Sequence, residues 1–229
     1  MSPIFTPLGI PLSDKKRKKE WSQFISNLFL KADPYLTARD DAPHIQISHQ
    51  YSLILMKHEG GNEKIVEPAV ILHDVGWSRL KPKQIEAAYG VKQEGEEAER
   101  LNRIHESEGA SIAWRILQSF FYEPSLIDKI ASIIQRHDSG NKVDSLEECL
   151  VKDADKLWRF SKIGFWKEIE RQGLSPAELH QYLSEHYQGW FYTASALTLA
   201  GGELEERAKE ITAHEKGHPS VRHNGYKDL

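Results

Sequence analysis

The sequence predicts an all-α fold with a single compact helical bundle. Apolar residues recur at helical spacing along most of the chain, and no segment shows the strict alternation typical of a half-buried strand. The chain has 229 residues, of which 39% are hydrophobic and 28% are charged. That length and that proportion of hydrophobic to charged residues are typical of a globular domain with a polar surface and a sizeable core.

The first half of the chain contains three predicted helices. The first spans residues 14–30, with its aromatic and aliphatic side chains on one side. A turn at residues 39–43 leads into the second helix, which Gly60-Gly61 ends. The third is short and apolar, covers residues 65–75 and ends at Gly76. Residues 82–100 are polar and contain two glycines, so we expect a mobile insertion there that could act as a lid.

The second half predicts further helices over residues 104–121, 124–134 and 146–160, with a break at 139–141 between the last two. Ser175 and Pro176 are a serine N-cap and a proline at the first helical position. They open an aromatic-rich helix that reaches about Tyr192.

Gly201-Gly202 should separate that helix from a charged one over residues 203–211. We expect an N-terminal helical extension at residues 1–35, one compact domain at 36–212 and a polar tail at 213–229.

Composition excludes several classes of protein. The formal net charge of −4 argues against a broad basic surface for nucleic acid or anionic membrane. Cys149 is the lone cysteine, so neither an internal disulfide nor a cysteine-based zinc site can form. No stretch has the ~18–20 apolar residues of a membrane span, and the basic run 14–19 follows the mildly apolar N-terminus, unlike a signal peptide. We expect a cytoplasmic protein.

Histidines and carboxylates at the ends or inner faces of helices predict a metal site. His73 and Asp74 follow a buried apolar run, and a buried aspartate is costly unless a cation or partner satisfies it. His44 shares a helical face with Tyr51, whereas His49 should face elsewhere. Imidazole and carboxylate together suit Mn, Fe, Co or Zn.

Two later histidines and one aspartate extend this set. His105 lies one turn before Gly109, which would let another backbone approach closely. His137 completes an apolar stripe with Ile130 and its neighbours. Asp153 and Asp155 flank the buried side of the next helix on opposite edges, and spacing alone does not choose between them.

These residues resemble the H…HD…D signature of the HD superfamily over roughly residues 40–160. His44, the His-Asp-Val-Gly motif at His73-Asp74 and the Ala-Asp-Lys-Leu run at Asp155 carry the resemblance. It implies an HD-domain helical bundle with the metal site in its core. It also implies the metal ligands His44, His73, Asp74 and Asp155, with Asp153 as the alternative or as a neighbour of the ligands, and His105 and His137 for a second ion.

The resemblance implies a phosphohydrolase that uses one or two divalent ions (Mn, Fe, Mg, Co or Zn) on a small phosphorylated metabolite or nucleotide. Asp74 would orient or deprotonate water, Lys156 would assist catalysis, and Arg39, Arg79 and Arg159 would bind phosphate. Trp77 departs from the family, because many HD phosphohydrolases have a helper glutamate just after the HD pair.

Two alternatives stay open. One is a di-iron HD-type oxygenase that cleaves a C–C or C–P bond. The other is a non-catalytic metal-binding module. A nucleic-acid or membrane partner is not expected, and a homodimer is compatible with the aromatic residues near the C-terminus.

Overall fold

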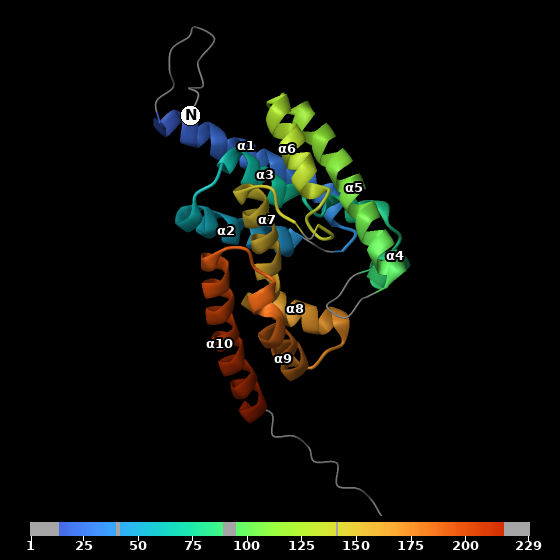
Figure 1. Ribbon diagram of the computed structural model, residues 1–229, viewed down its shortest axis with the longest axis vertical. Coiled ribbons are helices and arrows are strands. Elements are labelled where there is room, and N and C mark those ends of the chain that lie inside the picture. Colours follow the sequence, from blue (N-terminus) through green and yellow to red (C-terminus); the bar gives the residue numbers. More distant parts are fainter. Residues whose placement is uncertain (1–13, 40–41, 89–94, 141, 218–229) are drawn as a thin grey trace, which may run out of the picture.

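The computed structural model describes residues 14–39, 42–88, 95–140 and 142–217, which form helices and turns without a strand (Figure 1). The predicted all-α fold is therefore confirmed for this part of the chain. None of the described helices is both long enough and apolar enough to cross a bilayer. The α-helices are α1 (Asp14–Leu36), α2 (Ala42–Glu59), α3 (Glu63–Leu72), α4 (Pro82–Ala88), α5 (Glu96–Ser119), α6 (Pro124–Ile134), α7 (Leu146–Leu157), α8 (Lys162–Gln172), α9 (Pro176–His186) and α10 (Ala194–Gly217), and the 3₁₀ helices are η1 (Val75–Arg79), η2 (Trp158–Phe160) and η3 (Tyr187–Gly189).

Helix α3 lies at the centre of the fold and packs against α1, α2, α6 and α7. Its N-cap is Asn62, whose side chain accepts a hydrogen bond from Lys64 N. Every residue from Ile65 to Leu72 is buried, so this part of the helix has no solvent-exposed face. It ends at Leu72, before the predicted end at Val75, and this places His73 and Asp74 on a turn inside the core.

Helix α5 crosses this turn at very short range. A Cβ atom added to Gly76 would lie 1.9 Å from His105 O and 2.6 Å from Gly109 N. Only glycine at residue 76 permits this approach. The expected close contact at Gly109 is therefore present, and it brings His105 on α5 beside the His73-Asp74 turn.

Helices α8, α9 and α10 gather at the lower end of the molecule in Figure 1, away from α1, α5 and α6. Helix α8 lies in a stretch for which the sequence predicts no helix. Its signals are local: Ser161 is the N-cap and accepts from Gly164 N, and Gly173 ends the helix in a left-handed conformation with φ 63°. The predicted start of α9 is confirmed, because Ser175 and Glu178 form a reciprocal capping box.

Most of the stretch in which a mobile insertion was expected, residues 82–100, is helical where the structure describes it. Helix α4 and the first turns of α5 occupy most of it, and residues 89–94 lie outside the described part. Polar composition hid a small apolar face. Ile85 and Ala88 pack with Trp77, Leu80 and Leu101 in a cluster of their own.

Two other expected boundaries differ at the C-terminal end. Helix α10 runs through Gly201-Gly202 without a break, because Ala196, Ala200 and Leu204 are buried and outweigh the roughly 1 kcal/mol that each glycine costs in a helix. It continues to Gly217, so residues 213–217 of the expected tail are helical, and 218–229 lie outside the described residues. The aromatic-rich helix ends at His186, and η3 follows it.

Helix α1 begins where it was predicted and continues to Leu36 through Pro34. Its residues Ile25, Leu28 and Ala32 are buried in the same hydrophobic cluster as α3. Residues 1–13, with the mildly apolar start of the chain, lie outside the described part, as do Asp40, Asp41 and Asn141 of the expected turns.

Candidate metal centre

His73 is oriented by the backbone of its own helix. Its Nδ1 donates to Val70 O at 2.7 Å, which fixes the ring so that Nε2 points away from the helix backbone. The ring is fully buried, and Nε2 has no hydrogen-bond partner among the described residues. That nitrogen lies 3.3 Å from Asp155 Oδ1, so it faces a carboxylate with which it could hold a metal ion.

We call His44, His73 and Asp155 the inner group. They come from α2, from the turn after α3, and from α7, and all three are buried. His44 Nε2 donates to Asp155 Oδ1 at 2.9 Å, and the His44 ring stacks on Trp158 with centroids 5.2 Å apart. One ligand atom from each lies within 4.8 Å of the others, so the group could hold a metal ion.

We call His105, His137 and Asp138 the outer group. The Nε2 atoms of His105 and His137 lie 3.4 Å apart, and Asp138 Oδ2 lies 3.5 Å and 3.8 Å from them. This group could also hold an ion, but the Asp138 side chain is 35% exposed. His137 Nδ1 donates to Ile134 O at 2.8 Å, as His73 does to its own helix. His105 Nδ1 is buried and has no hydrogen-bond partner in the described part of the chain.

The carboxylate of Asp74 faces both groups. Its Oδ2 is 3.3 Å from His44 Nδ1 and 3.5 Å from His73 Nε2. Its Oδ1 is 3.4 Å from His137 Nε2 and 3.7 Å from His105 Nε2. One carboxylate therefore faces both groups with a different oxygen, which is the placement of a bridging ligand.

Trp77 and Arg39 hold Asp74 from the side. Trp77 Nε1 donates to Asp74 Oδ1 at 2.9 Å, and its ring stacks on His105 with centroids 4.0 Å apart and planes at 12°. Arg39 lies over the Trp77 ring, 4.6 Å from the centroid, and its NH1 lies 3.4 Å from Asp74 Oδ2. The indole of Trp77 therefore contacts two candidate ligands.

The electrostatics of the cluster favour cations. Burial alone would raise the pKa of Asp74, but His73, Arg39, His137 and His44 hold it well below its ordinary value. Burial alone would lower the pKa of His44, but its contacts with Asp155 and Asp74 raise it to about 9. His137 responds similarly: Asp138 and Asp74 outweigh burial and raise its pKa to about 10. Without metal, protons supply the positive charge that these carboxylates require, so the residues fit divalent ions.

Not every residue proposed from sequence reaches this cluster. Asp153 lies elsewhere: its carboxylate accepts from Tyr192 N, Thr193 N and Thr193 Oγ1, and so holds the start of α10. Lys156, expected to assist catalysis, donates instead to Trp190 O at 2.7 Å. Asp153 and Lys156 lie away from the cluster because they do not share the edge of α7 that carries Asp155. Of these three residues, Asp155 alone faces α2 and α3.

The three arginines expected to bind phosphate are also placed differently. Arg39 lies against the cluster. Arg79 is half-exposed and lies 3.7 Å from Glu108 Oε2. Arg159 follows Trp158, and its Nε is buried with no hydrogen-bond partner among the described residues. A phosphate-binding role for Arg79 and Arg159 thus has no support from contacts with the cluster.

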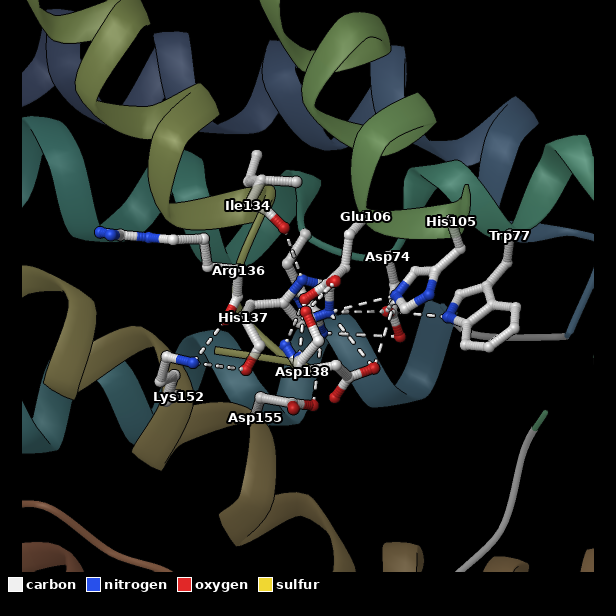
Figure 2. A network of polar contacts seen from close by, with 12 residues as sticks. Asp74, Trp77, His105, Glu106, Ile134, Arg136, His137, Asp138, Lys152 and Asp155 are labelled. Atoms are coloured by element: carbon white, nitrogen blue, oxygen red, sulfur yellow. Dashed lines mark hydrogen bonds and ion pairs between the residues drawn. The ribbon is translucent and has the colours of Figure 1, made fainter. Parts of the chain in front are cut away.

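Three residues at the centre escaped the sequence analysis. Asp138 directly follows His137, and that adjacency was the available signal. Glu106 and Lys152 are buried charged side chains that contact the backbone around His137 (Figure 2). Their partners are backbone atoms far away in the sequence, so no spacing rule indicates them.

The residues of both groups lie within a stretch of the chain that matches a known protein family. The model of the HD domain family matches residues 44–159, just over half of the chain, so the protein belongs to that family. The match begins at His44 and ends just after Asp155, and thus spans both groups. No curated protein sequence gave a match.

Several solved structures share the fold. An HD-superfamily hydrolase from Bacillus thuringiensis aligns with a TM-score of 0.57 and 21% identity, over 86% of this chain and 97% of that one. A predicted HD superfamily hydrolase from an uncultured Thermotogales bacterium gives 0.56 and 16%, over 84% and 91%. Bacillus subtilis YpgQ gives 0.54 and 18%, over 85% and 98%. The likeness therefore extends beyond the matched domain to most of the chain.

Proposed function

We propose that this protein is a metal-dependent phosphohydrolase that acts on a small phosphorylated metabolite or nucleotide. The position of Asp74 carries the proposal, because its two oxygens face two separate groups of histidine and carboxylate ligands. The description of two structural neighbours as HD-superfamily hydrolases supports hydrolysis as the reaction class.

Two divalent ions at such a site would lower the pKa of a water molecule and polarise a phosphoryl oxygen. The inner and outer groups would hold one ion each, with Asp74 shared between them. Arg39 keeps Asp74 ionised and adds positive charge at the cluster, where it would help to bind an anionic substrate. Trp77 fixes the orientation of the shared carboxylate through its indole N–H.

The test is a metal-loaded assay on a panel of nucleotides and sugar phosphates. The full-length protein is loaded in turn with Mn²⁺, Fe²⁺, Co²⁺, Mg²⁺ or Zn²⁺, and phosphate release is measured. His73→Ala and Asp74→Ala should abolish the activity. Full activity in both variants would contradict the proposed site.

The same metal-loaded protein also tests the two alternative functions, an oxygenase and a metal-binding module. Oxygen uptake by the iron-loaded protein, with no phosphate release from the panel, would favour an oxygenase. Bound metal with neither activity would favour a metal-binding module. Phosphate release that depends on the metal and on Asp74 supports the hydrolase.

A further inference from the structure

The turn between α6 and α7 carries two of the three outer-group residues. His137 and Asp138 follow the end of α6 at Ile134, so no regular helix fixes their backbone. In the inner group, by contrast, His44 and Asp155 lie within α2 and α7. Some other feature must hold the turn if it is to present two ligands in a fixed geometry.

Two buried charged side chains contact this turn from opposite sides (Figure 2). Glu106, on α5, accepts hydrogen bonds from Asp138 N at 2.8 Å, from Ser139 N at 2.9 Å and from Ser139 Oγ. Lys152, on α7, donates to Arg136 O, to His137 O at 3.1 Å and to Gly140 O at 2.9 Å. Each side chain is 1% exposed.

The contacts use the full hydrogen-bonding capacity of the lysine. An ammonium group has three donors, and all three meet carbonyl groups of residues 136–140. The carboxylate of Glu106 binds N–H groups of the same segment. Backbone donors and acceptors on both sides of His137 and Asp138 are therefore held by charge-assisted bonds.

A buried charge is costly to place and is weak evidence for stability by itself. The position of this pair suggests a different role, because the hydrogen bonds that both side chains make among the described residues go to the turn that carries the outer ligands. Neighbours that orient ligands in this way commonly set the affinity of a metal site.

We propose that Glu106 and Lys152 are positioning residues that clamp the His137-Asp138 turn and thereby determine whether the outer group holds its ion. This inference rests on the proposed function, since it requires two ion sites. It assigns the clamp to the outer group alone, so the inner group should not depend on it.

The chain offers a closely matched control. Asp153 is also a buried carboxylate, and it also accepts two backbone N–H bonds and one hydroxyl bond from a single turn. That turn begins α10 and carries no candidate ligand. Glu106→Gln and Asp153→Asn thus remove the same kind of interaction, one beside the outer group and one away from it.

The experiment loads wild-type protein and both variants with Mn²⁺ and measures bound ions per chain, together with the EPR signal of a coupled manganese pair. The wild type and Asp153→Asn should hold two ions and show coupling. Glu106→Gln should hold one ion without coupling, because its affinity for the second falls by about 10–100-fold. Lys152→Met should behave like Glu106→Gln, and it serves as the second variant if Glu106→Gln fails to fold.

Two coupled ions in both clamp variants would overturn the inference. Loss of the second ion in Asp153→Asn to the same extent would also overturn it, because the effect would then follow general destabilisation. A single ion in the wild type would overturn the dinuclear site and this inference together. Since the measurement counts ions, a failure to release phosphate would overturn the proposed reaction alone.

Discussion

The inner and outer groups use similar ligands but are held in different ways. The inner group lies on helices α2 and α7 and on a turn fixed by Val70 O, and the side chain of its carboxylate Asp155 is 8% exposed. In the outer group the Asp138 side chain is 35% exposed, and His105 Nδ1 has no hydrogen-bond partner among the described residues. A stack on Trp77 orients His105 where a hydrogen bond orients His73.

This difference suggests two ions of unequal affinity. Buried ligands that hydrogen bonds hold rigidly favour tight binding of a metal ion. A ligand at a solvent-exposed edge exchanges with water more easily. We expect the inner ion to bind first and the outer ion to depend on its surroundings.

Asp74→Asn should remove both ions, because both groups share this carboxylate. Phosphate release should fall by about 10³-fold or more, as when one member of a cooperating set is removed. The metal-free variant should lose about 3–5 kcal/mol of stability, since Arg39 and two imidazoles lose a buried partner. Metal analysis and chemical denaturation check this, and two bound ions in the variant would contradict a bridging role.

His73→Ala and His105→Ala should separate the groups. The first should remove the inner ion and the second only the outer ion. Crystals of Mn²⁺-loaded wild type should show two anomalous peaks about 3.5–4 Å apart, and each variant should lose the peak beside its own substitution. Loss of both peaks in His105→Ala would show that the groups are not independent.

Metal affinity should rise with pH, by up to about ten-fold per pH unit for each proton displaced. The pKa values of His44 and His137 are about 9 and about 10 in the metal-free chain, whereas burial and His137 lower the pKa of His105 to about 3. Metal binding at neutral pH should therefore release the protons that His44 and His137 hold in the metal-free chain. Calorimetry in buffers of different ionisation enthalpy counts these protons, and no release would contradict the prediction.

The stability of the metal-free chain should change with pH in the opposite direction. The folded pKa values of His44 and His137 lie above the ordinary value of 6.5. Their contribution is thus fully present below about pH 6.5 and is lost as the pH rises through about 9 and 10. The melting temperatures of the metal-free and the Mn²⁺-loaded protein should move further apart as the pH rises from 6 to 10. A constant difference between them would contradict both predictions.

Trp77→Phe should have the smallest effect. Phenylalanine keeps a ring against His105 but removes the hydrogen bond to Asp74 Oδ1. The Kd of the outer ion should rise by about ten-fold, the low end for a neighbour that orients a ligand. The control is Trp158→Phe, which retains a ring against His44 and should spare the outer ion. An equal change in both variants would remove the distinction between the groups.

Much of the fold was accessible from the sequence because the signals are local. Apolar spacing predicted most helices, and the serine and proline at 175–176 predicted the start of α9. The errors arose where tertiary burial overrides local composition. Gly201-Gly202 remain helical because α10 is packed, and α4 is a helix because its few apolar residues meet Trp77.

The residues of the candidate centre also divide into those that the sequence predicted and those that it could not indicate. His44, His73, Asp74, His105, His137 and Asp155 were selected from helical faces and from the resemblance, and the structure brings all six together. The direction of the Lys156 side chain could not be predicted, because a long side chain can point along its helix or away from it. In the structure its ammonium group donates to Trp190 O. Glu106 and Lys152 act on backbone atoms, which the identity of neighbouring side chains does not encode.

The two stacked indoles have a spectroscopic consequence. Trp77 lies on His105 of the outer group and Trp158 lies on His44 of the inner group, so each half of the centre has its own fluorophore at van der Waals range. A paramagnetic ion such as Co²⁺ bound at one half should quench the emission of the adjacent ring most strongly. Loading order could then be followed by optical titration, with Trp77→Phe and Trp158→Phe assigning each phase to one half.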